Sequence, residues 1–217
     1  MLVDASLAYT NLVGTNLSQL PRLSAPERRD QILQSAIHLF AQNGFRGTTT
    51  RELAQAVGVS EPVLYQHFPS KSDMYKAIIE NLMEKVQVMN LDEQNLPIDQ
   101  FFHRLAGGIL DFHEKNADYI RILLYSGLEG HELSRMFHER HACHVFDSLS
   151  RAMERRINDG SMRADLDPQL TARAFAMMIG DVGLKRILVP NAEPAGEQTR
   201  LVQQMVNIFL NGIVRSN

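Results

Sequence analysis

Apolar residues recur every three or four positions along most of this chain, which is the spacing of amphipathic α-helices. The first predicted helix begins at Ser24, which lies three residues before Glu27 in a capping-box spacing, and it ends at Asn43-Gly44. No alternation of apolar and polar residues is long enough to predict a β-strand. We therefore expect an all-α fold.

Two short helices follow, joined by a tight turn. Thr49 and Glu52 repeat the capping-box spacing at the start of the first, and Gly58 permits the sharp turn after it. Ser60 is placed to cap the second helix, residues 61–67, which is barely two turns long and must be held by its neighbours. A short helix after such a turn is what a helix-turn-helix motif places in the DNA major groove.

The rest of the chain continues in the same helical pattern. Including the three helices above, we expect about nine helices in all. The six further helices are predicted at approximately residues 71–91, 98–115, 119–128, 131–158, 167–189 and 197–214. The last two are apolar on more than one side, with Met178, Val182, Val206 and Phe209 beyond what one core face can use. Such helices are typical of a subunit interface.

The N-terminal segment, from about residue 26 to residue 85, resembles the TetR family of one-component bacterial regulators. The resemblance is carried by an ordered set of residues: Phe40, Gly44, Thr48-Thr49-Thr50, Leu53-Ala54, Gly58-Val59-Ser60, Leu64-Tyr65, Phe68 and Lys71. It implies a homodimer that pairs through its last two helices and binds double-stranded operator DNA. It also implies repression that is relieved when a small-molecule effector enters the C-terminal domain.

These patterns divide the chain into four parts. Residues 1–23 are expected to be a leader outside the core, and residues 24–70 the helix-turn-helix DNA-binding domain. Residues 71–91 are the expected connector helix. Residues 92–217 are the expected ligand-binding and dimerisation domain.

Base recognition is expected from the first turns of the two motif helices. Arg51 can form a bidentate pair with guanine, and Glu61 could accept from cytosine, although an acid at a helix start is also favoured by the helix dipole. Pro62 and Val63 suit a thymine methyl group. By the resemblance, Thr50, Tyr65, His67 and Lys71 match positions that hold the phosphate backbone. Ser60, at the start of the second motif helix, completes the expected DNA-binding set.

A ligand pocket is expected in the C-terminal domain, with two alternatives left open. Its expected apolar lining is Phe102, Phe112, Tyr119, Phe137 and Met177, and its polar groups are His141, His144 and Asp181. This mixture suits a hydrophobic or aromatic molecule with one or two polar handles. The same polar residues could instead be paired within a core or an interface. A closed core would favour control of the DNA-binding dimer by a protein partner.

Composition narrows the remaining classes of function. The 217 residues carry a net charge of −3 and a single cysteine, Cys143, which suits a reducing cytosol, and we expect a cytoplasmic protein. No signal peptide or membrane span is predicted. His138, His141 and His144 spread over roughly 120° of helix surface, so no metal site is expected. The sequence has no nucleophile elbow, phosphate-binding glycine loop or HExxH motif, and we expect neither an enzyme nor a cofactor.

Overall fold

The structure, a computed structural model, describes residues 24–87, 96–139, 143–190 and 194–214. These residues form ten α-helices, and the only β-structure among them is one isolated bridge, between Met162 and Val214. The helices are α2 (Ala25–Gly47), α3 (Thr50–Val57), α4 (Glu61–His67), α5 (Lys71–Gln87), α6 (Ile98–Lys115), α7 (Ala117–Leu128), α8 (Glu132–Phe137), α9 (Cys143–Asn158), α10 (Pro168–Leu188) and α11 (Ala195–Ile213). The all-α prediction is confirmed. The expected leader lies outside the described residues.

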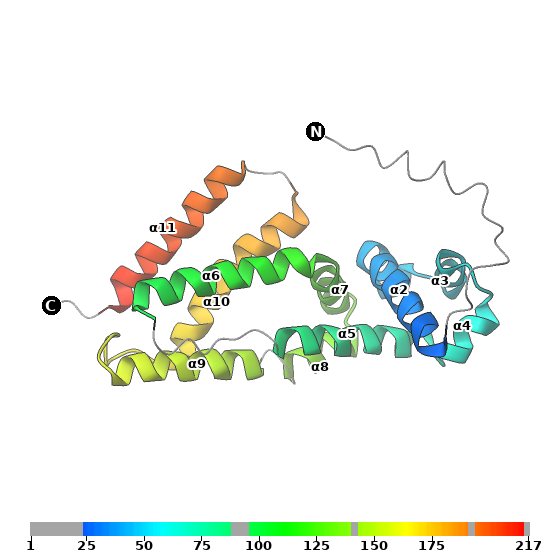
Figure 1. Cartoon of the computed structure of the whole chain (residues 1–217), viewed down its shortest axis with the longest axis horizontal. Helices are drawn as coiled ribbons and strands as arrows, with labels where there is room; N and C mark the ends of the chain where they lie inside the picture. The colour runs from blue at the N-terminus through cyan, green and yellow to red at the C-terminus, as the bar shows by residue number, and fades with distance from the viewer. Residues whose placement is uncertain (1–23, 88–95, 140–142, 191–193, 215–217) are drawn as a thin grey trace.

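The helix starts follow the capping signals of the sequence. Ser24 with Glu27 and Thr49 with Glu52 form complete capping boxes at α2 and α3. At α5 the hydroxyl of Ser70 accepts from the backbone N–H of Asp73 at 3.1 Å. Helices α2, α3 and α4 lie together at one end of the molecule, and α5 leads from them toward the larger helical region (Figure 1).

Two hydrophobic cores hold the helices together. The first joins α2, α3, α4 and α5 to α7, so it runs across the expected boundary between the domains. Tyr75 is fully buried in this core, and its hydroxyl donates to the backbone oxygen of Ile122 at 2.9 Å. The second core joins α6, α9, α10 and α11. In it, the ring of Phe175 lies 4.8 Å from Phe102 and 4.9 Å from Phe209, measured between ring centroids.

One detail of the expected helix pattern is wrong. Residues 131–158 are not one helix: α8 ends at Phe137, and α9 begins at Cys143. The two pieces pack on different partners, α8 against α5 and α7 and α9 against α10, which explains the division and the tenth helix. The connector helix is described to Gln87, so its expected last residues lie outside the described part.

No helix among the described residues is both long and apolar enough to cross a membrane.

Candidate DNA-binding site and pockets

The turn between α3 and α4 depends on glycine and on one buried leucine. Gly58 adopts a left-handed conformation with φ 73° and ψ 33°, and the next N–H, of Val59, donates to Ala54 at 2.9 Å. An added Cβ at Gly58 would meet nothing within 4 Å, so its backbone angles, not crowding, favour glycine. Leu64 is fully buried and anchors α4 against the core. The short α4 is therefore held by its neighbours, as its length requires.

Several of the expected DNA contacts point outward from this pair of helices. Arg51 is exposed and makes no hydrogen bond or ion pair within the described residues. Pro62 is exposed, Val63 is half-buried, and Tyr65 keeps 43% of its surface accessible, so Tyr65 is not a core aromatic. Ser60 occupies the N-cap of α4, but contrary to expectation its side chain makes no capping hydrogen bond. Its hydroxyl is thus free to contact a ligand.

Thr50 and Glu61 contact each other directly. The hydroxyl of Thr50 donates to Oε2 of Glu61 at 2.7 Å, which links the start of α3 to the start of α4. In this arrangement the hydroxyl proton of Thr50 is donated to Glu61 and cannot be donated to a phosphate at the same time. In the first turn of α3 the N–H of Glu52 donates to the hydroxyl of Thr49 at 3.2 Å. The N–H groups of Thr50 and Arg51 have no acceptor within their own helix and remain available to a phosphate.

Lys71 joins the start of α5 to the backbone at the end of α2 through two hydrogen bonds. Its ammonium donates to the backbone oxygens of Phe45 at 2.6 Å and of Thr48 at 2.9 Å, and lies 4.2 Å from the centroid of the Phe45 ring. Burial lowers the pKa of Lys71, and the nearby charge of Glu129 opposes that shift. An ammonium has three N–H donors. One donor is therefore left for the expected phosphate contact.

Arg29, which the sequence pattern did not single out, holds the other end of α4. Its Nη1 donates to the backbone oxygen of His67 at 2.6 Å, and its guanidinium lies 3.9 Å from the centroid of the Phe68 ring. The side chain of His67 is half-buried at this end of the helix. Arg29 lies on the polar face of α2, where sequence alone does not distinguish a structural cation from a solvated one.

Glu129, after the end of α7, fastens the C-terminal region to the DNA-binding end. Its carboxylate accepts from the backbone N–H groups of Phe45 and Arg46, both at 3.2 Å. Gly44 has a φ of 71°, and a Cβ there would lie 2.5 Å from Oε1 of Glu129. The glycine break in α2 therefore both turns these N–H groups outward and admits the carboxylate. Burial, followed by the charge of Glu129, raises the pKa of Tyr75.

We expect Glu129→Gln to loosen this junction. A glutamine oxygen can accept from one of the two N–H groups, while its NH₂ faces the other N–H as a second donor. Losing a charge-assisted hydrogen bond in this position should lower the free energy of unfolding by about 1.5–3 kcal/mol. Urea denaturation checks the value. Glu132→Gln, an exposed acid on α8, is the matched control and should change little.

The described members of the set expected around a ligand do not gather around one cavity. Phe102 is fully buried in the second core, whereas Phe112 and Phe137 pack against the first. Tyr119 is buried with its hydroxyl donating to Oδ1 of Asn81 at 2.6 Å, and burial raises its pKa. The other expected members are placed as follows: Met177 and Asp181 are exposed on α10, His141 lies outside the described residues, and the side chain of His144 is not described.

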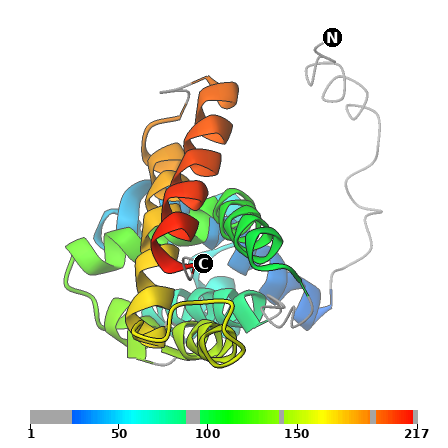
Figure 2. The same ribbon diagram turned by 90° about the vertical axis from the view of Figure 1, so that its left-hand side faces the viewer.

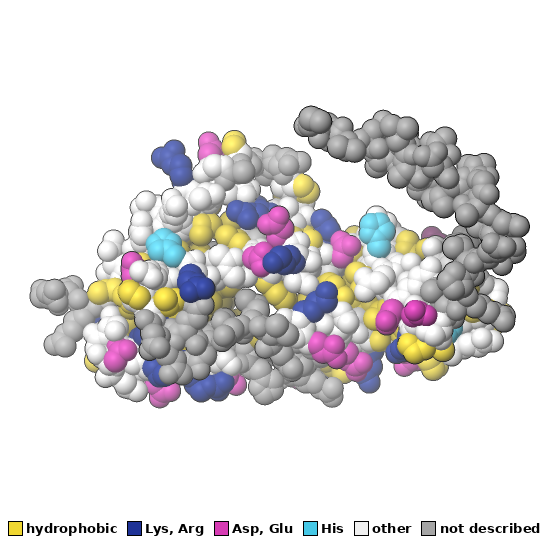
Figure 3. All heavy atoms as spheres, in the orientation of Figure 1, with side chains coloured by type: hydrophobic (Ala, Val, Ile, Leu, Met, Phe, Trp, Pro, Cys, Tyr) yellow, Lys and Arg dark blue, Asp and Glu magenta, His cyan; other side chains and the backbone are white. Residues whose placement is uncertain are grey.

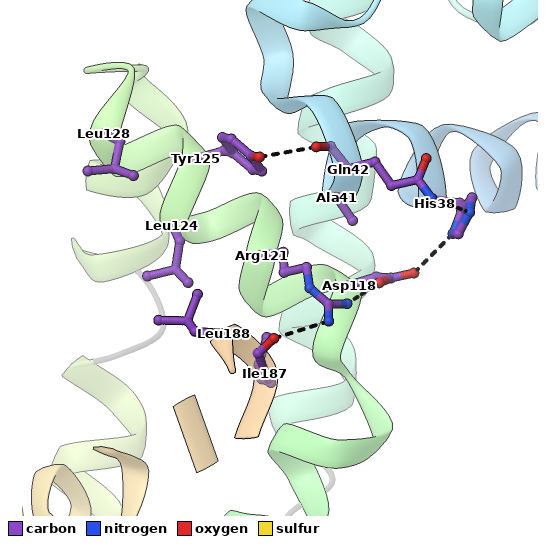
Figure 4. A pocket seen from close by; sticks show the side chains of 10 residues that line it. All are labelled: His38, Ala41, Gln42, Asp118, Arg121, Leu124, Tyr125, Leu128, Ile187 and Leu188. Atoms are coloured by element: carbon purple, nitrogen blue, oxygen red, sulfur yellow. Dashed lines mark hydrogen bonds and ion pairs between the residues drawn. The ribbon is translucent and has the colours of Figure 1, made fainter. Parts of the chain in front are cut away.

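Two open pockets lie instead where neighbouring helices meet. One, of about 620 Å³, is bounded by α2, α7 and the end of α10 (Figure 4). The other, of about 600 Å³, lies among α6, α7, α10 and α11. Arg186 lines the second pocket, and its Nε is buried without a hydrogen-bond partner among the described atoms. Among the expected ligand-binding residues with described side chains, none lines either pocket.

Comparison with known proteins places the chain in a family. Residues 32–78 match the profile of bacterial regulatory proteins of the tetR family, and residues 109–212 match the C-terminal domain of AefR-like transcriptional repressors. The chain is 32% identical over 151 residues to the nucleoid occlusion factor SlmA of Marinobacter nauticus, which covers 68% of this chain and 75% of that protein. The chain belongs to the TetR family. It is a DNA-binding regulator, and TetR-family regulators bind operator DNA and form dimers.

Further TetR-family comparisons agree on the fold. A SlmA from Glaesserella parasuis is 36% identical over 107 residues, and the chain spans about half of its length, 53%. A regulator from Saccharomonospora viridis, solved in complex with choline, superposes with a TM-score of 0.71 at 19% identity, over 88% of this chain and all of that one. A TetR-family regulator from Chloroflexus aurantiacus gives 0.66 at 20% identity, over 92% and 97%. At such identities the structural likeness shows the fold alone.

Proposed function

We propose that this protein is a homodimeric repressor that binds a palindromic operator and leaves it when a small hydrophobic or aromatic molecule binds. The main observation behind the proposal is the outward face of α3 and α4. There the side chains of Arg51, Ser60, Pro62 and Tyr65 are exposed on helices whose inner faces are fixed to the core. Rigid helices with unused contact groups are what base recognition requires.

The proposed contacts fall into two classes. Arg51 pairs with a guanine edge, and Pro62 and Val63 meet thymine methyl groups. Phosphate oxygens are bound by the hydroxyls of Ser60 and Tyr65, by His67 and by the remaining donor of Lys71; Thr50 contributes through the start of its helix. Glu61, which is already paired with Thr50 on one carboxylate oxygen, keeps the other oxygen for a cytosine amino group.

The distribution of charge supports a few specific contacts over general attraction to DNA. Residues 22–90 contain eight basic and seven acidic residues. On the face seen in Figure 3, dark-blue and magenta side chains are interspersed over the described surface. Affinity for nonspecific DNA should therefore be modest, and the sequence-reading contacts should carry most of the preference.

Dimerisation is proposed through the outer side of α10 and α11. Helix α11 lies along the edge of the molecule, with α10 beside it (Figures 1 and 2). Leu170 and Met177 on α10 are 64% and 67% exposed, and Leu201 and Ile208 on α11 are 42% and 62% exposed. The members of each pair are seven residues apart, so each pair lies on one helix face. Four residues expected at the interface lie inside the single chain instead: Val182 and Val206 are buried, and Met178 and Phe209 pack against the second core.

A second candidate function is a DNA-binding dimer controlled by a protein partner. Two observations favour it. The expected ligand-binding residues that the structure describes line neither of the two larger pockets between helices, and the SlmA proteins that this chain resembles are named as nucleoid occlusion factors. If this candidate is correct, no small molecule releases the operator, and the DNA-bound dimer binds a protein.

Selection from random duplex DNA tests the proposed DNA binding. The expected result is a two-fold-related motif whose half-sites lie about 34–36 Å apart along the duplex. A selection that returns no two-fold motif contradicts the proposal. Electrophoretic mobility shift with the selected duplex then gives the wild-type affinity with which variants are compared.

Arg51→Ala removes one bidentate base contact of roughly 1–3 kcal/mol from each protomer, so binding of the dimer to the selected operator is expected to weaken by about 30-fold or more. The preference at one base pair in each half-site should disappear at the same time. Arg151→Ala, which removes an exposed cation on α9 away from α3, is the control and should bind normally. An equal weakening on every sequence would place Arg51 on a phosphate instead of a base.

A further inference from the structure

The pocket between α2 and α7 lies where the DNA-binding end meets the C-terminal region (Figure 4). Its volume of about 620 Å³ is in the range of ligand sites for small organic molecules. Side chains of α2 form one wall, α7 forms the facing wall, and the end of α10 closes one side. An occupant would thus touch both parts of the protein at once.

The polar side of this pocket is a chain of groups that satisfy one another. Nη1 of Arg121 donates to Oδ1 of Asp118 at 2.8 Å, and Nη2 donates to the backbone oxygen of Ile187 at 3.2 Å. Nδ1 of His38 lies 3.6 Å from Oδ2 of Asp118. Nε2 of His38 lies 2.8 Å from the amide nitrogen of Gln42. These contacts join α2, α7 and α10 across the pocket (Figure 4).

The pairing also sets the charge of the pocket. The charges of Asp118 and Arg121 offset each other, so this pair presents no net charge to attract an ion. The polar wall can still offer hydrogen bonds to hydroxyl or carbonyl groups.

The opposite side of the pocket is apolar and open to water. Leu128 and Leu188 are 86% and 58% exposed, and Leu124 and Ile187 lie beside them in the lining. Covering exposed leucine side chains with an apolar molecule is favourable because it removes them from water. An apolar side opposite a neutral, hydrogen-bonding side favours an uncharged molecule with one or two polar groups.

We propose that this pocket is the effector site and that it takes an uncharged, largely apolar molecule with one or two polar groups. The proposal deepens the ligand-controlled function above and rests on it. It moves the site from the interior of the C-terminal domain to the junction of that domain with α2.

The position of the pocket explains how an occupant would act on DNA binding. Helix α2 shares its core with α3 and α4, so a displacement of α2 moves the recognition helices with it. The hydrogen bonds from the backbone of Phe45 and Arg46 to Glu129 also join the end of α2 to the end of α7. A ligand that fits a different spacing of α2 and α7 lowers operator affinity by its preference for that state.

The test uses N-phenyl-1-naphthylamine, an uncharged fluorescent aromatic with one N–H donor, as the probe. We expect it to bind wild type with increased fluorescence and to weaken operator binding measured in the same buffer. Gln42→Trp narrows the pocket from α2 with an exposed side chain, and Leu124→Trp narrows it from α7. Each should weaken probe binding at least tenfold. Asn43→Trp changes the neighbouring exposed residue, which does not line the pocket, and should leave probe binding unchanged.

The native chain has no tryptophan, so the emission of each introduced indole also reports whether that variant is folded. Probe binding that survives both pocket variants overturns the site. Probe binding that is abolished in both variants, without any effect on operator affinity in wild type, overturns the effector role. A change in sedimentation caused by Gln42→Trp alone would show that a second copy covers the pocket, which also overturns the proposal. Failure of the free wild type to bind an operator is a separate result and concerns the proposed function itself.

Discussion

Replacing Met177 and Ile208 together by glutamate is expected to convert the dimer into folded monomers that no longer hold the operator. Both side chains are largely exposed in the single chain, so the substitutions leave the core intact. In the proposed interface each carboxylate would be buried without a partner, at a cost of several kcal/mol. Dimerisation should weaken by about 100-fold or more, because roughly 1.4 kcal/mol corresponds to a factor of ten.

Sedimentation velocity measures the change in mass, and mobility shift measures operator binding on the same samples. The matched control is Gln203→Glu with Asn207→Glu, which adds the same charge to exposed polar positions of α11. The control should remain dimeric. A Met177 and Ile208 double variant that stays dimeric and binds DNA normally would place the interface elsewhere. Phe209→Glu is unsuitable, because the Phe209 ring packs 4.9 Å from Phe175 within the chain.

The sequence was most informative where structure depends on near neighbours. The complete capping boxes at α2 and α3 join residues three positions apart, and the left-handed turn at Gly58 depends on its own backbone angles. Such features can be predicted because every atom involved lies within one or two helical turns. The same is true of the overall helix order, which follows from the spacing of apolar residues.

Prediction was weaker where a side chain is shared between distant segments. Helical spacing places Phe102 on an apolar stripe, but only the packed structure shows that its ring is fully buried against Phe175 and Phe209. Met177 and Asp181 were grouped with the pocket for the same reason, yet they lie on the exposed side of α10. Periodicity identifies a stripe and does not say which neighbour covers it.

Glu129 and the pocket between α2 and α7 illustrate the same limit. Glu129 contacts residues more than eighty positions earlier in the chain, at Phe45 and Arg46. Nothing in its own sequence surroundings distinguishes it from a solvated acid at a helix end. The pocket likewise combines residues of α2, α7 and α10, and its paired polar groups become visible only when those helices are together.

Lys71→Met should show how far stability and operator binding depend on the two hydrogen bonds from Lys71 to the backbone. Methionine keeps the apolar stem but leaves the backbone oxygens of Phe45 and Thr48 without their donor. Each partly buried oxygen that loses its partner costs about 1–3 kcal/mol, so the free energy of unfolding should fall by at least about 2 kcal/mol. Operator binding should weaken as well, because the end of α2 and the start of α3 are no longer fixed to α5.

The dependence of operator binding on salt separates the two roles of Lys71. If the third donor holds a phosphate in each protomer, the slope of log affinity against log salt should become shallower by about 0.9 for each phosphate that the variant no longer neutralises. Urea denaturation supplies the stability on the same preparations. Lys76→Met, at an exposed position one turn further along α5, is the control and should change neither quantity much. A lower stability with an unchanged slope would mean that Lys71 acts only inside the protein, since the cation would then release no counterions from DNA. A variant as stable as wild type would show that the two hydrogen bonds of Lys71 do not stabilise the protein.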